Sequence, residues 1–185
     1  MLYCGNIDAA KTRSILDEAN VTHVVNCTTD HPLFFEGAGI QVSGERSECE
    51  RATIPCGAII IFLLTSIQYL RFPIAEWWRK APTRGDHGQL LRFLSPLFDF
   101  VLDALKRDKS VMVHCLAGAH RAGTTGCILL MYKAGLSAMA AIAAAKRLRP
   151  VIDPIGRFPE LLQKVQVLQD EKKRALKKAA TPEAS

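Results

Sequence analysis

Short β-branched runs and longer helical repeats alternate along the chain. Residues 21–27 and 110–114 are short and apolar, which predicts two buried strands. Residues 69–74 predict a third strand, which stops near Pro73. Strands separated by helical segments favour an α/β fold with a central, mostly parallel, twisted sheet of about four to five strands flanked by helices.

The helices are predicted from apolar spacing and from their caps. Residues 9–19 have a helical pattern, and leucines recur at helical spacing over residues 90–105. Pro96 falls inside that second stretch, so the helix either begins there, with Ser95 as its cap, or is kinked. Further helices are predicted at residues 121–134 closed by Gly135, from Ser137 to before Pro150, and from about Pro159 into the C-terminal tail.

One segment, residues 42–68, interrupts this alternation. It is polar, then contains Cys and Pro, and then becomes strongly apolar, and so long a connection is uncommon in a small domain. Codons for residues 41–43 can form a splice donor, and codons for residues 61–68 can form a pyrimidine tract with an acceptor. Two interpretations therefore stand: a translated retained intron, or a genuine long loop. In either case we expect the insertion to lie away from the chemistry.

The composition fits one globular domain. The 185 residues are 49% hydrophobic and 23% charged, which excludes a disordered or collagen-like chain. Six cysteines are too few for a disulfide scaffold. We expect no secretory signal and no transmembrane segment, because the strongest apolar run, residues 58–64, is far shorter than the about 20 residues that span a bilayer. The expected location is the cytoplasm, with the nucleus as the alternative.

The positive charge of +6 is concentrated at the C-terminus. We therefore divide the chain into one domain over residues 1–169 and a basic tail over residues 170–185. The tail is either a solvated helix end or a patch that contacts acidic surfaces. No aromatic residues interleave with its charges, so a nucleic-acid partner is not expected. The basic residues of the tail are Lys172, Lys173, Arg174, Lys177 and Lys178.

The candidate chemistry lies between a strand and a helix. The strand ends at His114 and Cys115, a loop of small residues follows, and Arg121 opens the helix. In such a turn the backbone N–H groups and the positive end of the helix dipole bind an anion, and Arg121 adds a bidentate fork for phosphate oxygens. Cys115 at the base, its thiolate stabilised there, is placed to attack phosphorus without a metal or cofactor. The phosphate-binding loop residues are Leu116, Ala117, Gly118, Ala119, His120 and Arg121.

Two other readings of this loop are weaker. Cys115 could be a buried residue beside a tight turn, but a chance match to His-Cys-x-x-Gly-x-x-Arg in this context is rare. A zinc site from His114, Cys115 and His120 has the wrong spacing, and no Cys-x-x-Cys pair completes it.

This motif resembles that of the cysteine-based protein phosphatases, and within them the dual-specificity family. Residues 2–6 resemble the opening strand of that family, and residues 22–26 resemble its next strand. Arg149-Pro150, followed by Pro154 and Phe158, resembles its late motif. The resemblance implies hydrolysis of phosphate monoesters on phosphoproteins, at phosphotyrosine, phosphoserine or phosphothreonine.

The resemblance also assigns roles. It implies that Cys115 forms a phosphocysteine intermediate, that Arg121 binds the phosphate, and that His114 helps to stabilise the thiolate from behind the loop. The family needs a general acid after the third strand. Glu76 holds that position when counted from the strand, whereas Asp86 fits when counted back from the next helix and has the usual residue type, although it could equally cap that helix.

Two residues depart from the family pattern. Ala122 follows the loop arginine, where a hydroxyl commonly assists hydrolysis of the phosphoenzyme; Thr124 or Thr125 could substitute, or could face the helix interior. Ile155 stands where the family often has Asn, so a hydrogen bond to the loop is expected to be lost. These departures favour an alternative, a phosphate-binding module with weak turnover. A third reading keeps the chemistry but changes the substrate to a phosphoglucan or an RNA 5′-phosphate.

Overall fold

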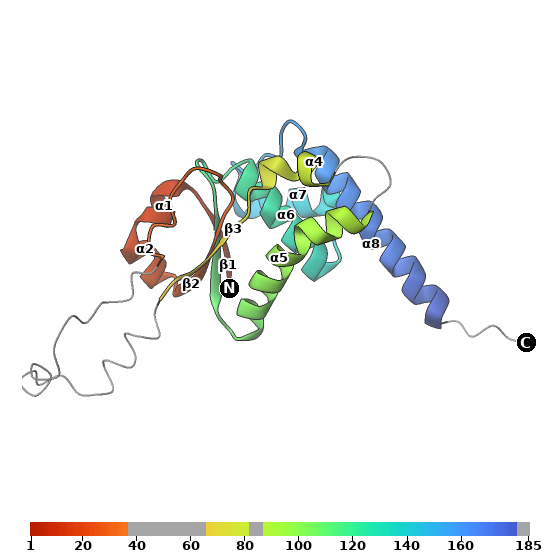
Figure 1. Ribbon diagram of the computed structural model, residues 1–185, viewed down its shortest axis with the longest axis horizontal. Helices are drawn as coiled ribbons and strands as arrows, with labels where there is room; N and C mark the ends of the chain where they lie inside the picture. Colours follow the sequence, from red (N-terminus) through yellow and green to blue (C-terminus); the bar gives the residue numbers. More distant parts are fainter. Residues whose placement is uncertain (37–65, 82–86, 181–185) are drawn as a thin grey trace, which may run out of the picture.

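The computed structural model describes residues 1–36, 66–81 and 87–180. Four parallel strands form one sheet in the order β1-β4-β2-β3 (Figure 1). The predicted α/β class with a parallel, helix-flanked sheet is thereby confirmed. The strands are β1 (Leu2–Gly5), β2 (Val21–Asn26), β3 (Gln68–Arg71) and β4 (Ser110–His114).

The last residues of the four strands lie side by side. His114 of β4 pairs with Gly5 on one side and with Asn26 on the other, and Asn26 pairs with Arg71. Because all strands run in the same direction, the segments that follow them emerge at one edge of the sheet. Ligands of open α/β sheets bind at this carboxyl edge, and the residue after His114 is Cys115.

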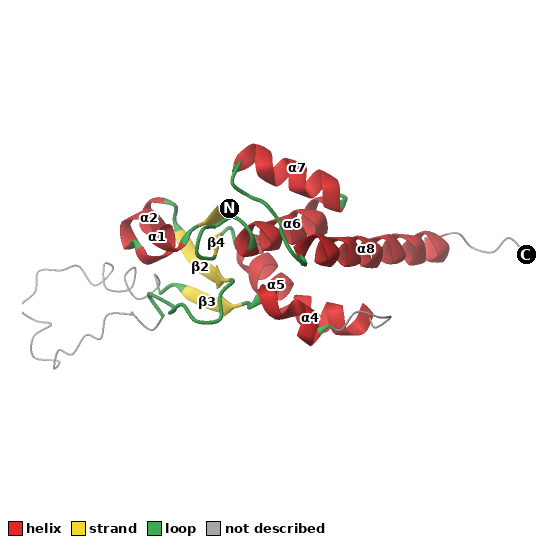
Figure 2. Cartoon of the chain, turned by 90° about the horizontal axis from the view of Figure 1, so that it is seen from above, coloured by secondary structure: helices red, strands yellow, loops and turns green. Residues whose placement is uncertain are grey.

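Helices cover both faces of the sheet (Figure 2). The short α1 and α2 lie on one face, and α5, α6, α7 and α8 lie on the other. The helices are α1 (Ile7–Lys11), α2 (Arg13–Glu18), the 3₁₀ helix η1 (Ile74–Glu76), α4 (Trp77–Lys80), α5 (His87–Lys106), α6 (Arg121–Ala134), α7 (Ala138–Leu148) and α8 (Phe158–Ala180).

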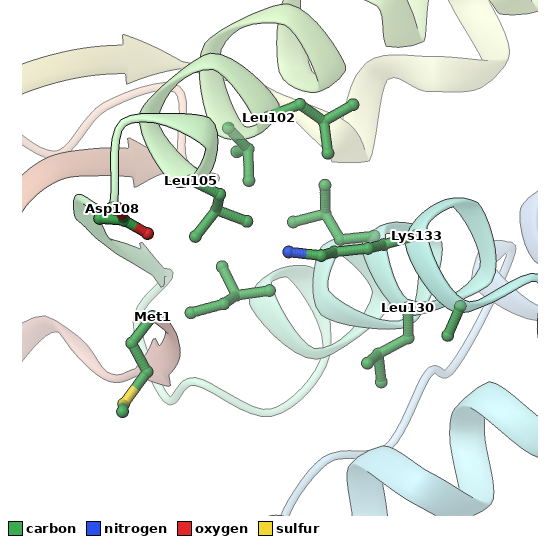
Figure 3. A pocket seen from close by; sticks show the side chains of 10 residues that line it. Met1, Leu102, Leu105, Asp108, Leu130 and Lys133 are labelled. Atoms are coloured by element: carbon green, nitrogen blue, oxygen red, sulfur yellow. The ribbon is translucent and has the colours of Figure 1, made fainter.

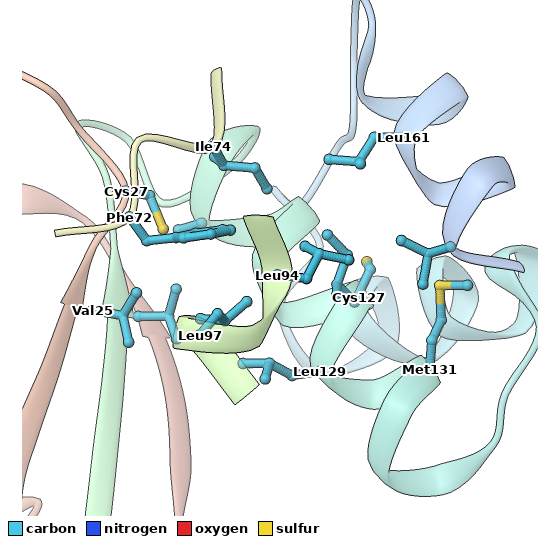
Figure 4. Close-up of a cluster of buried hydrophobic side chains, with 14 of the residues drawn as sticks. Val25, Cys27, Phe72, Ile74, Leu94, Leu97, Cys127, Leu129, Met131 and Leu161 are labelled. Carbon is cyan, nitrogen blue, oxygen red and sulfur yellow. The ribbon is translucent and has the colours of Figure 1, made fainter. Parts of the chain in front are cut away.

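The main hydrophobic core fills the space between the sheet and the larger helical layer (Figure 4). Val25 from the sheet, Leu97 from α5 and Leu129 from α6 all contribute to it. A smaller cluster lies on the other face, where Leu16 of α2 packs with Val24 and Met112. The sheet is thus buried on both faces, which explains why its central strands carry apolar residues on both faces, such as Val24 and Val25 in β2 and Met112 and Val113 in β4.

Several predicted elements are confirmed at their bounds. β4 and α6 span the predicted residues, and Gly135 ends α6 in the left-handed conformation with φ 64°. Ser137 caps α7 by accepting a hydrogen bond from the Ala140 N–H at 3.2 Å. These elements combine strong apolar patterning with unambiguous caps, so local sequence suffices to fix them.

Three predicted elements differ from the structure. The expected helix at residues 9–19 is two helices, because Thr12 adopts an extended conformation and its hydroxyl donates to the Asp8 carbonyl at 2.7 Å. The third strand ends at Arg71, and Phe72 and Pro73 connect it to η1, which begins at Ile74. α5 does not start at Pro96 but runs through it, and Figure 1 shows the helix changing direction along its course.

Most of the segment at residues 42–68 lies outside the described residues, as does the apolar run at residues 58–64. Its last three residues, 66–68, are described. Ile67 is buried in the smaller core cluster, and Gln68 begins β3 opposite His23. Gln68 therefore belongs to the sheet and Ile67 to the core, and the interpretation of the remainder as a retained intron or a loop stays a prediction.

α8 extends beyond the body of the domain (Figure 1). Its basic residues are exposed, although Lys173 donates to the Gly135 carbonyl at 3.4 Å and Lys172 lies 5.8 Å from the Tyr132 ring centroid. In the described part of the chain, no single helix is long and apolar enough to cross a membrane. Only α6 and α7 taken together meet those criteria, and they are bent by 117° at their junction.

Candidate functional site

The predicted phosphate loop connects the centre of the sheet to a helix N-terminus. β4 places Cys115 at the carboxyl edge, and α6 begins at Arg121. Between them Gly118 has φ 70°, a left-handed conformation that favours glycine. A Cβ at Gly118 would lie 2.5 Å from the Gly5 carbonyl oxygen, so the close approach of the loop to β1 also requires glycine there.

Carbonyl oxygens of the loop are bound by partners behind it. The Leu116 carbonyl accepts from the Ile7 N–H at 3.0 Å. The Gly118 carbonyl accepts from Arg149 Nε at 3.5 Å and from the Cys4 thiol at 3.6 Å. In a trans peptide the carbonyl of one residue and the N–H of the next point in opposite directions. The N–H groups that follow these carbonyls therefore point to the other side of the loop.

The late segment after α7 holds the loop in the same way. The Asp153 N–H donates to the Ala119 carbonyl at 3.2 Å, and His120 Nδ1 lies 2.5 Å from the Asp153 carbonyl oxygen. Lys146 pairs with the Asp153 carboxylate at 2.8 Å and lowers the pKa of that carboxyl. Ile155 is largely exposed. Sequence reasoning identified Arg149 only through the late motif, and no local signal marked Cys4 or Asp153.

The front of the loop is left with unpaired donors. Within the described residues, the backbone N–H groups of Ala117, Ala119 and His120 have no hydrogen-bond acceptor. The Arg121 guanidinium likewise forms no ion pair with any described carboxylate. Ala119 is buried and His120 half-buried, and N–H groups in such places normally have a hydrogen-bond acceptor. The unpaired N–H groups of the loop, together with the N-terminus of α6, form a nest suited to an anion.

The electrostatic character of His114 follows from its burial. It is fully buried, and neither ring nitrogen has a hydrogen bond of good geometry in the described part of the chain. Burial lowers the pKa of His114 to about 4; interaction with the Cys115 backbone opposes this shift, whereas the charges of His31 and Arg71 add to it. A pKa this low favours the neutral imidazole at physiological pH, and the expected role of His114 in stabilising the Cys115 thiolate stays a prediction.

Hydroxyl groups near the loop are already engaged. Ala122, which follows the loop arginine, is fully buried. The Thr124 hydroxyl donates to the His120 carbonyl at 2.6 Å, and the Thr125 hydroxyl donates to the Arg121 carbonyl at 3.0 Å. Both threonine hydroxyls thus donate to backbone carbonyls four residues earlier in the chain. Neither therefore replaces the hydroxyl that Ala122 lacks.

The other described cysteines are inert core residues. Burial raises the pKa of Cys4 to about 11 and that of Cys127 to about 12. Burial also raises the pKa of Cys27, whose sulfur lies 3.3 Å from the Thr125 hydroxyl. These three thiols stay protonated at neutral pH. Cys115 is the described cysteine that lies at the base of the anion nest.

The segment after β3 carries the candidate general acids. Glu76 ends η1 and is partly buried, whereas Asp86 lies outside the described residues. Trp77 is in the core, and Trp78 is 37% exposed. Arg79 and Arg157 lie 4.9 and 4.7 Å from the Trp78 ring centroid. Two positively charged side chains, Arg79 and Arg157, thus lie beside the Trp78 ring, on the same edge of the sheet as the loop.

A cavity of the described part of the chain lies elsewhere (Figure 3). It has a volume of about 620 Å³ and separates α5 from α6 at the amino end of β1, with Leu105 and Leu130 in its walls and Asp108 and Lys133 at its edge. No group of three His, Cys, Asp or Glu side chains in the described ranges could hold a metal ion. The chemistry that this arrangement supports is therefore that of the loop at residues 115–121.

Comparisons with known proteins agree with this geometry. The family model for the catalytic domain of dual-specificity phosphatases matches residues 2–167. Human dual specificity protein phosphatase 9 is 25% identical over 185 residues, covering 100% of this chain and 39% of that protein. Human dual specificity protein phosphatase 6 is 25% identical over 157 residues, covering 85% of this chain and 32% of that protein. The chain thus spans less than half the length of these relatives.

The fold matches as well. The crystal structure of human DUSP28 superposes with a TM-score of 0.63 at 23% identity and covers 92% of this chain and 94% of that one. That likeness concerns the arrangement of strands and helices. The family match over nearly the whole chain, on a sheet whose central strand leads into the anion nest, shows that this chain belongs to the dual-specificity phosphatase family.

Proposed function

We propose that the chain hydrolyses phosphate monoesters on phosphoproteins, without a metal, through a phosphocysteine intermediate. The observation that carries this proposal is the phosphate loop itself. Several of its carbonyls accept hydrogen bonds from behind the loop, and among the described residues the N–H groups of Ala117, Ala119 and His120 and the Arg121 guanidinium have no partner. Such donors stabilise the charge of the phosphoryl group as it is transferred. Its substrates are phosphotyrosine and phosphoserine or phosphothreonine side chains.

In the first step, the Cys115 thiolate attacks phosphorus in line with the leaving oxygen. The S–P bond forms as the P–O bond to the substrate breaks, and Asp86 or Glu76 gives its proton to the leaving oxygen. In the second step, water attacks the phosphocysteine and gives a proton to the carboxylate left from the first step; the new P–O bond forms as the S–P bond breaks, which releases inorganic phosphate and regenerates the thiolate and the acid. The described cysteines are all free thiols, which fits our proposal of a reducing, cytoplasmic location.

The test is hydrolysis of 4-nitrophenyl phosphate by the purified chain, in reducing buffer with EDTA. We expect turnover that Cys115→Ser abolishes, while that variant still binds tungstate or phosphate. Cys127→Ala is the matched control, because it changes a buried cysteine of the core and should keep activity. Arg121→Lys keeps the charge but loses the bidentate fork, and should weaken phosphate binding. Full activity of Cys115→Ser would refute the nucleophile assignment.

A second candidate is a phosphate-binding module with slow turnover. Ala122 and the engaged hydroxyls of Thr124 and Thr125 favour it, because no described hydroxyl is free to assist the second step. Rapid-quench measurements separate the two candidates. A burst of nitrophenol equal to the enzyme concentration, followed by very slow release of phosphate, indicates the module. Steady turnover without accumulation of phosphoenzyme indicates the phosphatase.

A further inference from the structure

A second cavity lies directly behind the phosphate loop. It has a volume of about 420 Å³, is open to solvent on one side, and is lined by residues of β1, β4, α6, α7 and the segment after α7. Pockets of this volume are large enough for small ligands. Leu130 lines both this cavity and the larger one, and Figure 3 shows its side chain pointing away from Lys133. The walls that matter here are Leu2, Gly126, Leu130, Leu148, Arg149 and Ile152.

Gly126 keeps this cavity open. It lies in the interior of α6, where glycine destabilises a helix, and a Cβ added there would meet nothing within 4 Å. Gly123, one turn earlier, contrasts with it, because a Cβ there would lie 2.8 Å from Ile152 Cγ2. Packing therefore explains Gly123 but not Gly126. The absence of a side chain at Gly126 leaves space that the described residues do not fill.

Arg149 supplies the only charge among these walls. Its side chain is partly buried, and it has no carboxylate partner in the part of the chain that the structure describes. Its hydrogen bond from Nε to the Gly118 carbonyl is long, at 3.5 Å. A guanidinium beside an apolar cavity pairs best with a planar anion, and carboxylate matches its fork.

We propose that this cavity binds a small monocarboxylic acid with an apolar body. The carboxylate pairs with Arg149, and the hydrocarbon lies against Leu2 and Leu130 and reaches the space at Gly126. At about 30 Å³ for each water-sized group, the cavity of about 420 Å³ has room for about 14 such groups, more than the about ten non-hydrogen atoms of an eight-carbon acid. Octanoate has this size and chemistry. The site is independent of Cys115, so it stands whether or not the chain turns over phosphate esters.

The test is calorimetric titration of the full chain with octanoate, below its micelle concentration, using variants first checked for folding by circular dichroism. We expect a dissociation constant on the order of 0.1–1 mM. Gly126→Leu fills the cavity and should weaken binding at least about tenfold. Ala134→Leu is the matched control, because it places the same side chain on α6 but in the larger cavity, and should leave octanoate binding unchanged.

The charge is tested separately. Wild-type protein should bind octanoate roughly tenfold more tightly than 1-octanol, because a charge-assisted hydrogen bond contributes about that factor. Arg149→Met should remove this preference while keeping an apolar side chain of similar length. Equal octanoate binding by wild type and Gly126→Leu would overturn the proposal, since the ligand would then bind elsewhere. Absence of binding at several millimolar octanoate would overturn it as well.

Discussion

Gly118 of the phosphate loop lies so close to Gly5 at the end of β1 that a Cβ would come within 2.5 Å of the Gly5 carbonyl oxygen. At Gly118 and Gly5 the loop and the edge strand are thus in contact through their backbones. Gly118→Ala would force them apart and would place alanine at φ 70°. We expect a loss of unfolding free energy of about 1–3 kcal/mol and a roughly 100-fold fall in kcat/KM, measured by urea denaturation and by aryl phosphate hydrolysis.

Gly135→Ala is the matched control for this substitution. Gly135 also has a positive φ, 64°, but a Cβ there would meet nothing within 4 Å. It should cost about 1 kcal/mol of stability from backbone strain alone and leave kcat/KM unchanged. Equal activity losses in the two variants would show that the close contact with Gly5 has no bearing on the loop.

His114 should make the stability of the protein depend on pH. Its pKa of about 4 in the folded protein lies below the ordinary value of 6.5, so at intermediate pH the unfolded chain binds a proton that the folded chain does not. Stability should therefore fall as pH drops from about 6.5 towards 4, by on the order of 3 kcal/mol in total. Burial also lowers the pKa of His23, so His23 adds to the same fall in stability. The contribution of His114 must therefore be isolated by substitution.

The measurement compares the unfolding free energies of wild type and His114→Asn between pH 4.5 and 7.5. The variant lacks the titrating group, so its stability should depend less on pH. The unfolding free energy of wild type minus that of His114→Asn should therefore be largest at pH 7.5 and should decrease as the pH falls. A difference that stays constant over this range would contradict a neutral, buried His114.

The general acid can be identified by its dependence on the leaving group. Asp86→Asn should lower kcat by about 10²–10⁴-fold for a substrate with a poor leaving group, such as a phosphotyrosine peptide. The effect should be much smaller for 4-nitrophenyl phosphate, whose leaving group needs little protonation. Glu76→Gln is the comparison, and we expect it to retain most activity. The reverse ranking would assign the role to Glu76.

Ala122→Ser should speed the second half of the reaction. The added hydroxyl would lie directly after Arg121, in the position where related phosphatases carry one, and Thr124 and Thr125 do not supply it. We expect a smaller burst and a kcat about tenfold higher, measured by rapid quench. Thr124→Val should leave the burst unchanged. An unaltered burst in Ala122→Ser would show that hydrolysis of the phosphoenzyme does not limit turnover.

Octanoate should weaken phosphate binding if the cavity behind the loop is its site. Arg149 forms a wall of the cavity and donates to the Gly118 carbonyl, so a carboxylate would compete for the same guanidinium. Tungstate affinity of Cys115→Ser should then fall at saturating octanoate, and octanoate affinity should fall by the same factor at saturating tungstate. Unchanged affinities would mean that the cavity and the loop are not coupled.

Local patterns predicted much of the fold. β4, α6 and α7 follow from apolar runs bounded by strong caps such as Gly135 and Ser137, and these elements carry the phosphate loop. The break at Thr12 was not predicted, and the sequence left open whether α5 begins at Pro96 or passes through it, because each outcome depends on competition between local preference and packing. Short elements such as α1 and η1 are stabilised mainly by tertiary contacts with the elements packed against them.

The sequence by itself determined the identity of the chemical groups. The spacing of Cys115, Gly118 and Arg121 between a strand and a helix already predicts an anion-binding loop, because a strand end, a turn of small residues and a helix N-terminus are all recognisable from local sequence. Tertiary structure decided how those groups behave. The pKa of His114 is low because the fold buries it, and three loop N–H groups have no partner among the described residues because Ile7, Arg149 and Asp153 bind the loop carbonyls from behind. Burial and long-range hydrogen bonds of this kind depend on residues far apart in the chain, so no local pattern encodes them.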